Sequence, residues 1–175
     1  YYETDNYTFR KFDVNDHAVA PDGYLIRTNY SVCGLAGDGM GHIRFETTVD
    51  YLKQQFDDQK LDFNDLINEL PRLLKHSLTR TDLNSIMPRD RQDTTFVWFQ
   101  DYIPRWSTAS AIMIQGIREG MPANQNTMWV VNGFPLTSVV IPIWFDAEGK
   151  LPAILMGDEK GLSRLSEYSL QLKDF

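Results

Sequence analysis

Two polar side chains at the ends of predicted strands have the residue types that could do chemistry. Asn29 follows the apolar stretch Tyr24–Ile26, where the sequence turns polar and then runs into a glycine-rich loop. An amide at the rim of a sheet can donate a hydrogen bond to a developing oxyanion, or it can tie down the loop. The residues around Asn29 leave both roles open.

Arg105 is the second candidate, because it lies between Pro104 and Trp106 just before a predicted strand. These neighbours restrict the arginine, so its guanidinium could clamp a carboxylate or stabilise an anionic nucleophile. A structural role is the alternative, with the side chain stacked on Trp106 or paired with Asp101. Taken alone, the sequence chemistry favours the structural role.

No complete catalytic set accompanies these two residues. Cys33 lies between Val32 and Gly34 with no histidine nearby in the sequence, and a thiol mechanism needs a base beside the thiol. We expect Cys33 to be a bystander. The hydroxyl groups near Arg105 lack the context of a nucleophile elbow, and no pair of carboxylates stands out as an acid–base couple.

Metal and cofactor sites are not predicted. A single cysteine excludes a disulfide framework and a multi-cysteine metal site, and the three histidines have no ligand spacing. The loop Gly34–Gly41 follows a predicted strand and precedes a predicted helix, but it has neither the phosphate-loop nor the dinucleotide spacing. Asp38 would also repel an anion. We expect a surface connection there and no cofactor.

The overall composition limits the partners. The 175 residues carry a net charge of -7, with a pI near 4.9 and no basic stripe, which argues against nucleic acid. The longest apolar run, Val139–Phe145, is interrupted by Pro142 and is too short to span a membrane. With 42% hydrophobic residues the chain can fold as one domain, residues 1–175.

The N-terminal half should position Asn29 beside helices. Tyr1–Phe12 has the chemistry of a hairpin around Asp5 and Asn6, and Tyr24–Ser31 is predicted to be a strand. Apolar residues three or four apart then predict helices. These are Ile43–Phe56, a second helix capped by Asp62 and kinked or split at Pro71, and a short third helix from Thr81 to Ile86.

The C-terminal half should position Arg105 at the start of a strand. Four strands are predicted at Thr94–Asp101, Ser107–Gly116, Thr127–Val131 and Ser138–Phe145. The last of these is nearly all apolar and should be central. A hairpin at 146–149 leads to Leu151–Met156, and the helical segment Ser163–Asp174 follows. This order predicts an α+β layered domain.

Four segments, in order, resemble a known family. They are Ile26–Ser31, Gly34–Phe45, Tyr102–Ser110 and Thr127–Pro135. They resemble the later part of N-terminal-nucleophile hydrolases of the acyl-CoA:6-aminopenicillanic acid (isopenicillin N) acyltransferase-like group, which is related to choloylglycine hydrolases and penicillin V acylases. Each segment is a weak signal alone, but the similarity runs across essentially the whole chain, with the four segments in the same order.

The resemblance implies a fold and a reaction. It implies an αββα sandwich in which an N-terminal cysteine attacks a linear amide C–N bond while its own α-amine acts as base. The acyl group then passes to water or to another amine. Asn29 would be the oxyanion donor and Arg105 would support the nucleophile. The implied substrate is a small amide or acyl compound.

The chain also departs from the family pattern. It begins at Tyr1, and Cys33 does not match the family's nucleophile. We therefore expect this chain to be the C-terminal portion of such an enzyme, inactive by itself, with the missing N-terminal portion as its partner. A signal peptide would lie upstream, so a secreted or periplasmic location stays open. The rival interpretations are a non-enzymatic α+β binding module and a self-associating fragment that forms homo-oligomers.

Overall fold

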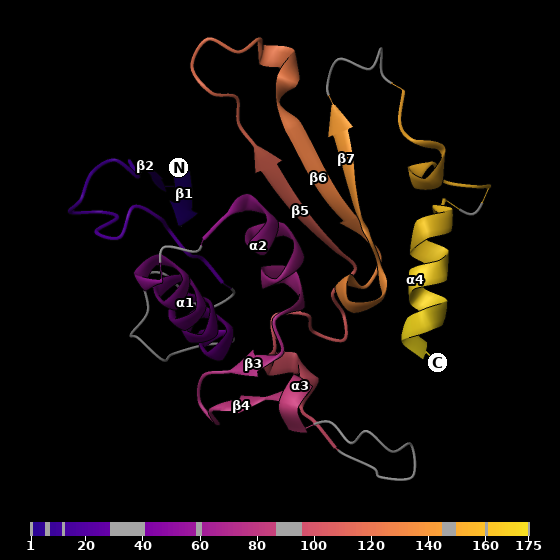
Figure 1. The fold of residues 1–175 in the computed structure, drawn as a ribbon, viewed down its shortest axis with the longest axis horizontal. Coiled ribbons are helices and arrows are strands. Elements are labelled where there is room, and N and C mark those ends of the chain that lie inside the picture. Colours follow the sequence, from indigo (N-terminus) through magenta and orange to yellow (C-terminus); the bar gives the residue numbers. More distant parts are fainter. Residues whose placement is uncertain are drawn as a thin grey trace.

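The computed structural model has a mixed α+β fold (Figure 1). Three separate antiparallel sheets and four α-helices are distributed along the described part of the chain. The α+β class predicted from the sequence is confirmed. The described residues are 2–5, 8–11, 13–28, 41–58, 61–86, 96–144, 150–159 and 161–174.

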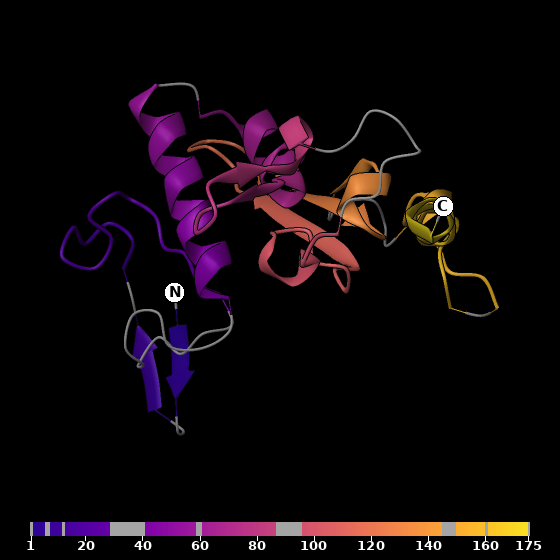
Figure 2. The ribbon, with the colours of Figure 1, turned by 90° about the horizontal axis from the view of Figure 1, so that it is seen from below.

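The N-terminal hairpin pairs β1 (Tyr2–Asp5) with β2 (Thr8–Lys11), and Tyr2 lies opposite Lys11. The predicted hairpin is confirmed for these residues. The hairpin and helix α1 (His42–Asp57) lie at one end of the molecule, and helix α4 (Arg164–Asp174) lies at the other (Figure 1, Figure 2). The largest sheet and helix α2 (Phe63–Asn68) lie between the two ends.

Helix α1 forms where the apolar spacing predicts it, and two of its side chains belong to the first core cluster. Gly41, with φ 95°, precedes its first turn, a left-handed conformation that glycine adopts without steric cost. Tyr51 and Leu52 of this helix are buried together with Leu73. Six half-buried apolar side chains pack around them: Tyr24, Ile26, Leu61, Leu66, Leu70 and Ile103.

Helix α2 (Phe63–Asn68) begins with the predicted cap. The Asp65 N–H donates to the Asp62 carboxylate at 2.8 Å, and the Asp62 N–H donates to the Asp65 carboxylate at 3.4 Å. Because Pro71 cannot continue an α-helix, the chain changes to the 3₁₀ turn η1 (Leu70–Arg72). The predicted split of this helix is confirmed.

A small hairpin follows, and the residues on either side of it, Leu74 and Leu83, belong to the second core cluster. Strands β3 (Lys75–His76) and β4 (Thr81–Asp82) pair in antiparallel register and lead into helix α3 (Leu83–Ile86). The predicted third helix is present, but it begins at Leu83 because Thr81 and Asp82 form β4. The Asp82 carboxylate accepts the Asn84 N–H at 3.0 Å in its first turn. The second cluster buries Leu74, Leu83 and Tyr102.

The largest sheet has the order β5–β6–β7, formed by Ser110–Gln115, Thr127–Asn132 and Val140–Trp144. The prediction that the most apolar strand is central is wrong, because β6 is the middle strand of these three. Pro142 of β7 lacks the N–H that a central strand must donate, which is why this strand suits an edge. The turns η3 (Ala123–Gln125) and η4 (Pro135–Thr137) flank β6.

The two faces of this sheet differ. The Trp129 ring on one face lies 5.3 Å from the Phe63 ring of α2, so α2 contacts that face. On the other face, the cross-strand register aligns Ile112 with Val130 and Ile141, and it aligns Ile114 with Met128 and Ile143. Ile112 and Ile114 remain 60% and 68% exposed. These six apolar residues form a patch that Ser110 and Asn132 border at one end of the face, and a patch with this exposure is characteristic of an interaction surface.

Three other strand predictions differ from the structure. Residues 24–28 form no strand, because the Tyr24 ring stacks on Phe56 of α1 at 5.6 Å and Ile26 packs into the first core cluster. The described part of Thr94–Asp101 ends in the 3₁₀ turn η2 (Phe99–Asp101). Leu151–Met156 contains the turn η5 (Ala153–Leu155), and residues 146–149 lie outside the described residues.

Helix α4 is confirmed and docks at the end of β6. The Asn132 side chain donates to the Ser163 hydroxyl at 2.8 Å and accepts from the Ser166 hydroxyl at 2.9 Å. Ser169 donates to the Phe134 carbonyl oxygen at 3.1 Å. Among the helices within the described ranges, none is long and apolar enough to cross a membrane.

Candidate functional site

Asn29 and Cys33 lie outside the described residues, so the structure describes the approach to Asn29 up to Thr28. The Thr28 hydroxyl donates to the Gly41 carbonyl oxygen at 3.0 Å, and Arg27 donates to the Ile26 carbonyl oxygen at 2.8 Å. The end of the apolar stretch is therefore attached to the residue that precedes α1.

Arg105 lies in a tight turn between the second core cluster and β5. Its backbone N–H donates to the Ile103 carbonyl oxygen at 3.0 Å, and its carbonyl oxygen accepts from Thr108 at 2.9 Å. Pro104, immediately before it, is fully buried, and the arginine itself is half-buried. The Nε atom of Arg105 is buried and has no hydrogen-bond partner within the described ranges. A buried donor in this state has capacity for a ligand.

The two structural roles considered for Arg105 are not observed. The Trp106 ring is occupied by a different cation, because the Lys173 ammonium lies 4.0 Å from its centroid and also donates to the Trp106 carbonyl oxygen. No ion pair joins the Arg105 and Asp101 side chains, both of which are described. Neither stacking on Trp106 nor a salt bridge with Asp101 therefore holds the guanidinium of Arg105.

A second arginine contributes to the charge around Arg105. Burial lowers the pKa of Arg44 on the first turns of α1, and the positive charge of Arg105 lowers this pKa further. Asp101 acts in the opposite direction, toward a higher pKa of Arg44. Two guanidinium groups and one carboxylate of the described residues therefore influence one another here.

The first core cluster holds the segments that lead to Asn29 and Arg105. Ile26 and Ile103 both pack against its buried residues. Asn29 follows Ile26 by three residues, and Arg105 follows Ile103 by two. The structure therefore brings together the two segments that lead to the sequence-predicted site residues, although they are more than seventy residues apart in the chain.

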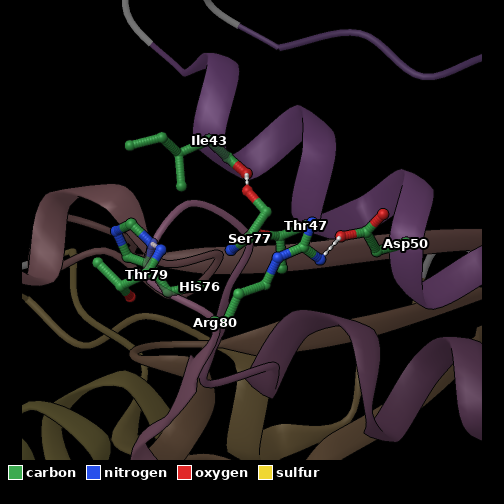
Figure 3. Close-up of polar contacts among 7 residues, drawn as sticks. All are labelled: Ile43, Thr47, Asp50, His76, Ser77, Thr79 and Arg80. Carbon is green, nitrogen blue, oxygen red and sulfur yellow. Dashed lines mark hydrogen bonds and ion pairs between the residues drawn. The ribbon is translucent and has the colours of Figure 1, made fainter.

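A separate polar pocket of about 270 Å³ lies between α1 and the β3–β4 hairpin. Figure 3 shows how the hairpin is attached to α1: the Ser77 hydroxyl donates to the Ile43 carbonyl oxygen at 3.1 Å, and Arg80 reaches Asp50 at 3.3 Å. The Ser77 N–H also donates to the Thr47 hydroxyl at 3.1 Å. These contacts make the helix and the hairpin opposite walls of one pocket.

His76 at the base of this pocket has the packing role that its isolated place in the sequence predicts. It is 8% exposed, its ring lies edge-on to Tyr102 at 5.3 Å, and its Nδ1 atom accepts the Thr79 N–H at 3.2 Å. Since Nδ1 is the acceptor, the neutral ring carries its proton on Nε2. The histidine closes the turn of the hairpin.

Arg80 in the same turn has an unfavourable backbone. Its φ of 56° is in the left-handed region, and it is the only non-glycine residue with a positive φ among those the structure describes. Such a conformation costs about 1–3 kcal/mol for a non-glycine residue. The Arg80–Asp50 ion pair is exposed, and exposed pairs contribute about 0–1 kcal/mol. The ion pair therefore does not explain why an arginine occupies this position.

Sequence reasoning did not identify this pocket. Residues 75–80 precede a predicted helix, and nothing in their order indicates a left-handed arginine. The conformation arises because the hairpin docks on a helix about thirty residues earlier in the chain, through the Thr47 and Asp50 side chains. The helical spacing that puts Thr47 and Asp50 on one face of α1 is the one signal that was available.

Comparisons with protein-family models, with curated proteins and with solved structures found no match for this chain. The family resemblance therefore depends on the residues of the chain itself. The strongest site features that these residues provide are the half-buried Arg105 near Arg44 and the pocket beside Arg80.

Proposed function

We propose that this chain supplies part of the active site of an N-terminal-nucleophile hydrolase that acts on linear amide C–N bonds, or transfers their acyl group, in the isopenicillin N acyltransferase-like group. Asn29 is the oxyanion donor and Arg105 supports the nucleophile. The nucleophilic cysteine belongs to a segment outside these 175 residues. This proposal takes its reaction from the resemblance of the four sequence segments.

The observation that carries the proposal is the state of Arg105. Its Nε atom is buried without a hydrogen-bond partner in the described part of the chain, and neither Trp106 nor Asp101 uses its charge. A half-buried guanidinium near a second arginine favours an anion beside it. A cysteine thiolate is such an anion, and a neighbouring positive charge lowers the pKa of a thiol.

The reaction then follows from these groups. The α-amine of the N-terminal cysteine, whose unperturbed pKa is near neutrality, takes the thiol proton, and the sulfur attacks the amide carbonyl carbon. The carbonyl oxygen becomes an oxyanion that accepts a hydrogen bond from the Asn29 amide. The C–N bond breaks, the amine leaves with the proton, and the thioester passes its acyl group to water or to a second amine.

The open face of the sheet is consistent with the proposed fold. In an αββα sandwich a second sheet packs about 10 Å from the first, face to face. The apolar face that includes Ile112 and Ile114 has the composition such packing requires, and α2 on the opposite face would form an outer layer. We propose that the segment bearing the cysteine also contributes strands to this second sheet.

A kinetic comparison of two arginine variants tests the proposal. The protein is produced from its complete coding sequence, and hydrolysis of penicillin V and of other N-acyl amides is followed. We expect Arg105→Gln to lower kcat/KM by about 100-fold, the scale for loss of one electrostatic stabiliser, and to move the acidic limb of the pH–rate profile to higher pH. Arg118→Gln, at an exposed arginine, is the control and should change neither.

Two results would overturn the proposal. One is a complete coding sequence that yields no processed N-terminal cysteine, and the other is an Arg105→Gln variant with the same kinetics and pH profile as Arg118→Gln. Failure of the variant to fold is recognised from its circular dichroism, and Arg105→Lys then provides the test, because it keeps the charge and removes the planar fork.

A second candidate function rests on the same open face. If the chain is a self-associating or binding module, the face with Ile112 and Ile114 is its interface. Sedimentation of the 175-residue chain distinguishes the two functions: a dimer that Ile112→Lys dissociates, without amide hydrolysis from the complete coding sequence, favours the module.

A further inference from the structure

The pocket between α1 and the β3–β4 hairpin contains charges of both signs. Arg80 and Asp50 both line it and form an ion pair at 3.3 Å. Lys75 and Asp82 also line it and lie directly opposite each other in the register of the hairpin. Two positive and two negative side chains therefore surround one pocket of about 270 Å³.

Some of these polar groups are already used by the fold, and others are available to a ligand. The Asp82 carboxylate accepts the Asn84 N–H, and the Tyr51 hydroxyl donates to Glu69 at 3.0 Å. In contrast, the Arg80 and Asp50 side chains are 80% and 51% exposed, and their single contact is at the long end of hydrogen-bonding distance. A ligand can therefore separate this ion pair at small cost.

The backbone of Arg80 indicates that its guanidinium is needed where it is. A glycine would adopt a φ of 56° without strain, and the exposed ion pair with Asp50 does not compensate an arginine for that strain. Local strain of this kind is typical of functional positions. In Figure 3 the Arg80 side chain extends from the turn toward Asp50 on α1, across the opening between the helix and the hairpin.

The distribution of charge selects the class of ligand. A simple anion would be attracted by Arg80 and Lys75 but repelled by Asp50 and Asp82. A simple cation would be attracted by Asp50 and Asp82 but repelled by Arg80 and Lys75. A molecule with both charges can place its carboxylate at the planar guanidinium of Arg80 and its ammonium at the Asp50 carboxylate, where each finds an opposite charge. Both ends of such a molecule are then stabilised.

We propose that this pocket binds a small zwitterion of the amino-acid type, with its carboxylate on Arg80 and its ammonium on Asp50. The pocket of about 270 Å³ has room for a small ligand such as a single amino acid. The site is separate from Arg105 and does not depend on the proposed hydrolase activity.

Calorimetric titration of the full protein with three matched probes tests the charge argument. The probes are L-alanine, propionate, which lacks the ammonium, and ethylamine, which lacks the carboxylate. We expect L-alanine to bind at least about tenfold more tightly than either analogue. Equal binding of propionate and L-alanine would contradict the zwitterion assignment, and so would equal binding of ethylamine. No binding of any probe would overturn the site.

Two variants test the residues. Arg80→Gly should abolish L-alanine binding while the melting temperature stays the same or rises, because glycine relieves the left-handed strain. Asp50→Asn should weaken L-alanine binding by at least about tenfold. It should not weaken propionate binding, because the substitution removes a carboxylate that repels an anion. Lys53→Gln, at an exposed lysine on the same helix outside the pocket, is the control and should have no effect.

The stability readout separates binding from a structural role. If Arg80→Gly lowers the melting temperature, the arginine is there for stability and the proposal is wrong. If Arg80→Gly leaves binding of L-alanine intact, the carboxylate is held elsewhere and the proposal is equally wrong. Arg80→Asn, which also tolerates a left-handed backbone, repeats the test with a polar side chain.

Discussion

Replacement of Gly133 by alanine should be among the most damaging single-methyl changes in the described fold. Gly133 follows β6 and has a φ of 102°, which side-chain-bearing residues rarely adopt. A Cβ atom at this position would lie 2.5 Å from both Cβ and Oγ of Ser169 on α4. Ser169 is 1% exposed and cannot move away freely.

The expected cost has two parts. A left-handed or related backbone costs a non-glycine residue about 1–3 kcal/mol. Forcing an extra carbon into a packed site costs about 1–3 kcal/mol more. Gly133→Ala should therefore lower the free energy of unfolding by about 2–6 kcal/mol, and α4 should separate from the sheet first. Since Lys173 at the end of α4 covers Trp106, the tryptophan next to Arg105 should report this separation.

Urea denaturation followed by tryptophan fluorescence measures the effect. Gly116→Ala is the matched control, because a Cβ atom there would have no neighbour within 4 Å and its φ is not positive. We expect that control to change the free energy of unfolding by less than about 1 kcal/mol. If Gly133→Ala were no more damaging than Gly116→Ala, the docking of α4 on the end of β6 would be wrong.

Three further changes probe the elements around the site, each measured by urea denaturation. Asp62→Ala should cost about 1 kcal/mol through loss of the α2 cap, and an unchanged midpoint would refute the capping box. Arg72→Lys should lower the free energy of unfolding by about 2 kcal/mol, because Arg72 donates to the Pro135 carbonyl oxygen at 2.8 Å and also to the Asn68 carbonyl oxygen at the end of α2. Wild-type stability of this variant would show that these bonds are dispensable. Burial raises the pKa of Tyr51 above its usual 10.0, and the hydrogen bond with Glu69 raises it further. The unfolded state therefore loses this proton first, so the free energy of unfolding should fall as the pH rises through about 10. Tyr51→Phe should reduce this fall in stability, and an unaltered pH dependence would contradict the role given to Tyr51.

The helices could be predicted from the sequence because their signals are local. The apolar spacing of α1, the Asp62 cap and the break at Pro71 each act within a few residues, and all three are found in the structure. Strand pairing is not local. The apolar run around Pro142 was expected at the centre of the sheet, whereas the order of partners puts it at an edge.

The stretch before Asn29 illustrates the same limit. Tyr24 and Ile26 have the composition of a buried strand, and they are indeed packed against apolar neighbours, but those neighbours belong to a helix and a core cluster. A strand needs partners for its backbone N–H and C=O groups, and composition does not supply them.

The site was predictable only in part. Arg105 stood out because Pro104 and Trp106 flank it, and the structure keeps its charge away from both structural partners that the sequence offered. The Arg80 pocket did not stand out, because its geometry depends on a hairpin docking against a distant helix. The role of Asn29 stays a prediction.

The covalent intermediate offers the most direct test of the proposed hydrolase. The protein produced from its complete coding sequence is mixed with an N-acyl amide, quenched in acid within the first turnover, digested and analysed by mass spectrometry. We expect the acyl group as a thioester on an N-terminal cysteine outside these 175 residues, at lower occupancy in Arg105→Gln than in Arg118→Gln. An acyl group on Cys33, or no acylated peptide while the amide is consumed, would contradict the assignment.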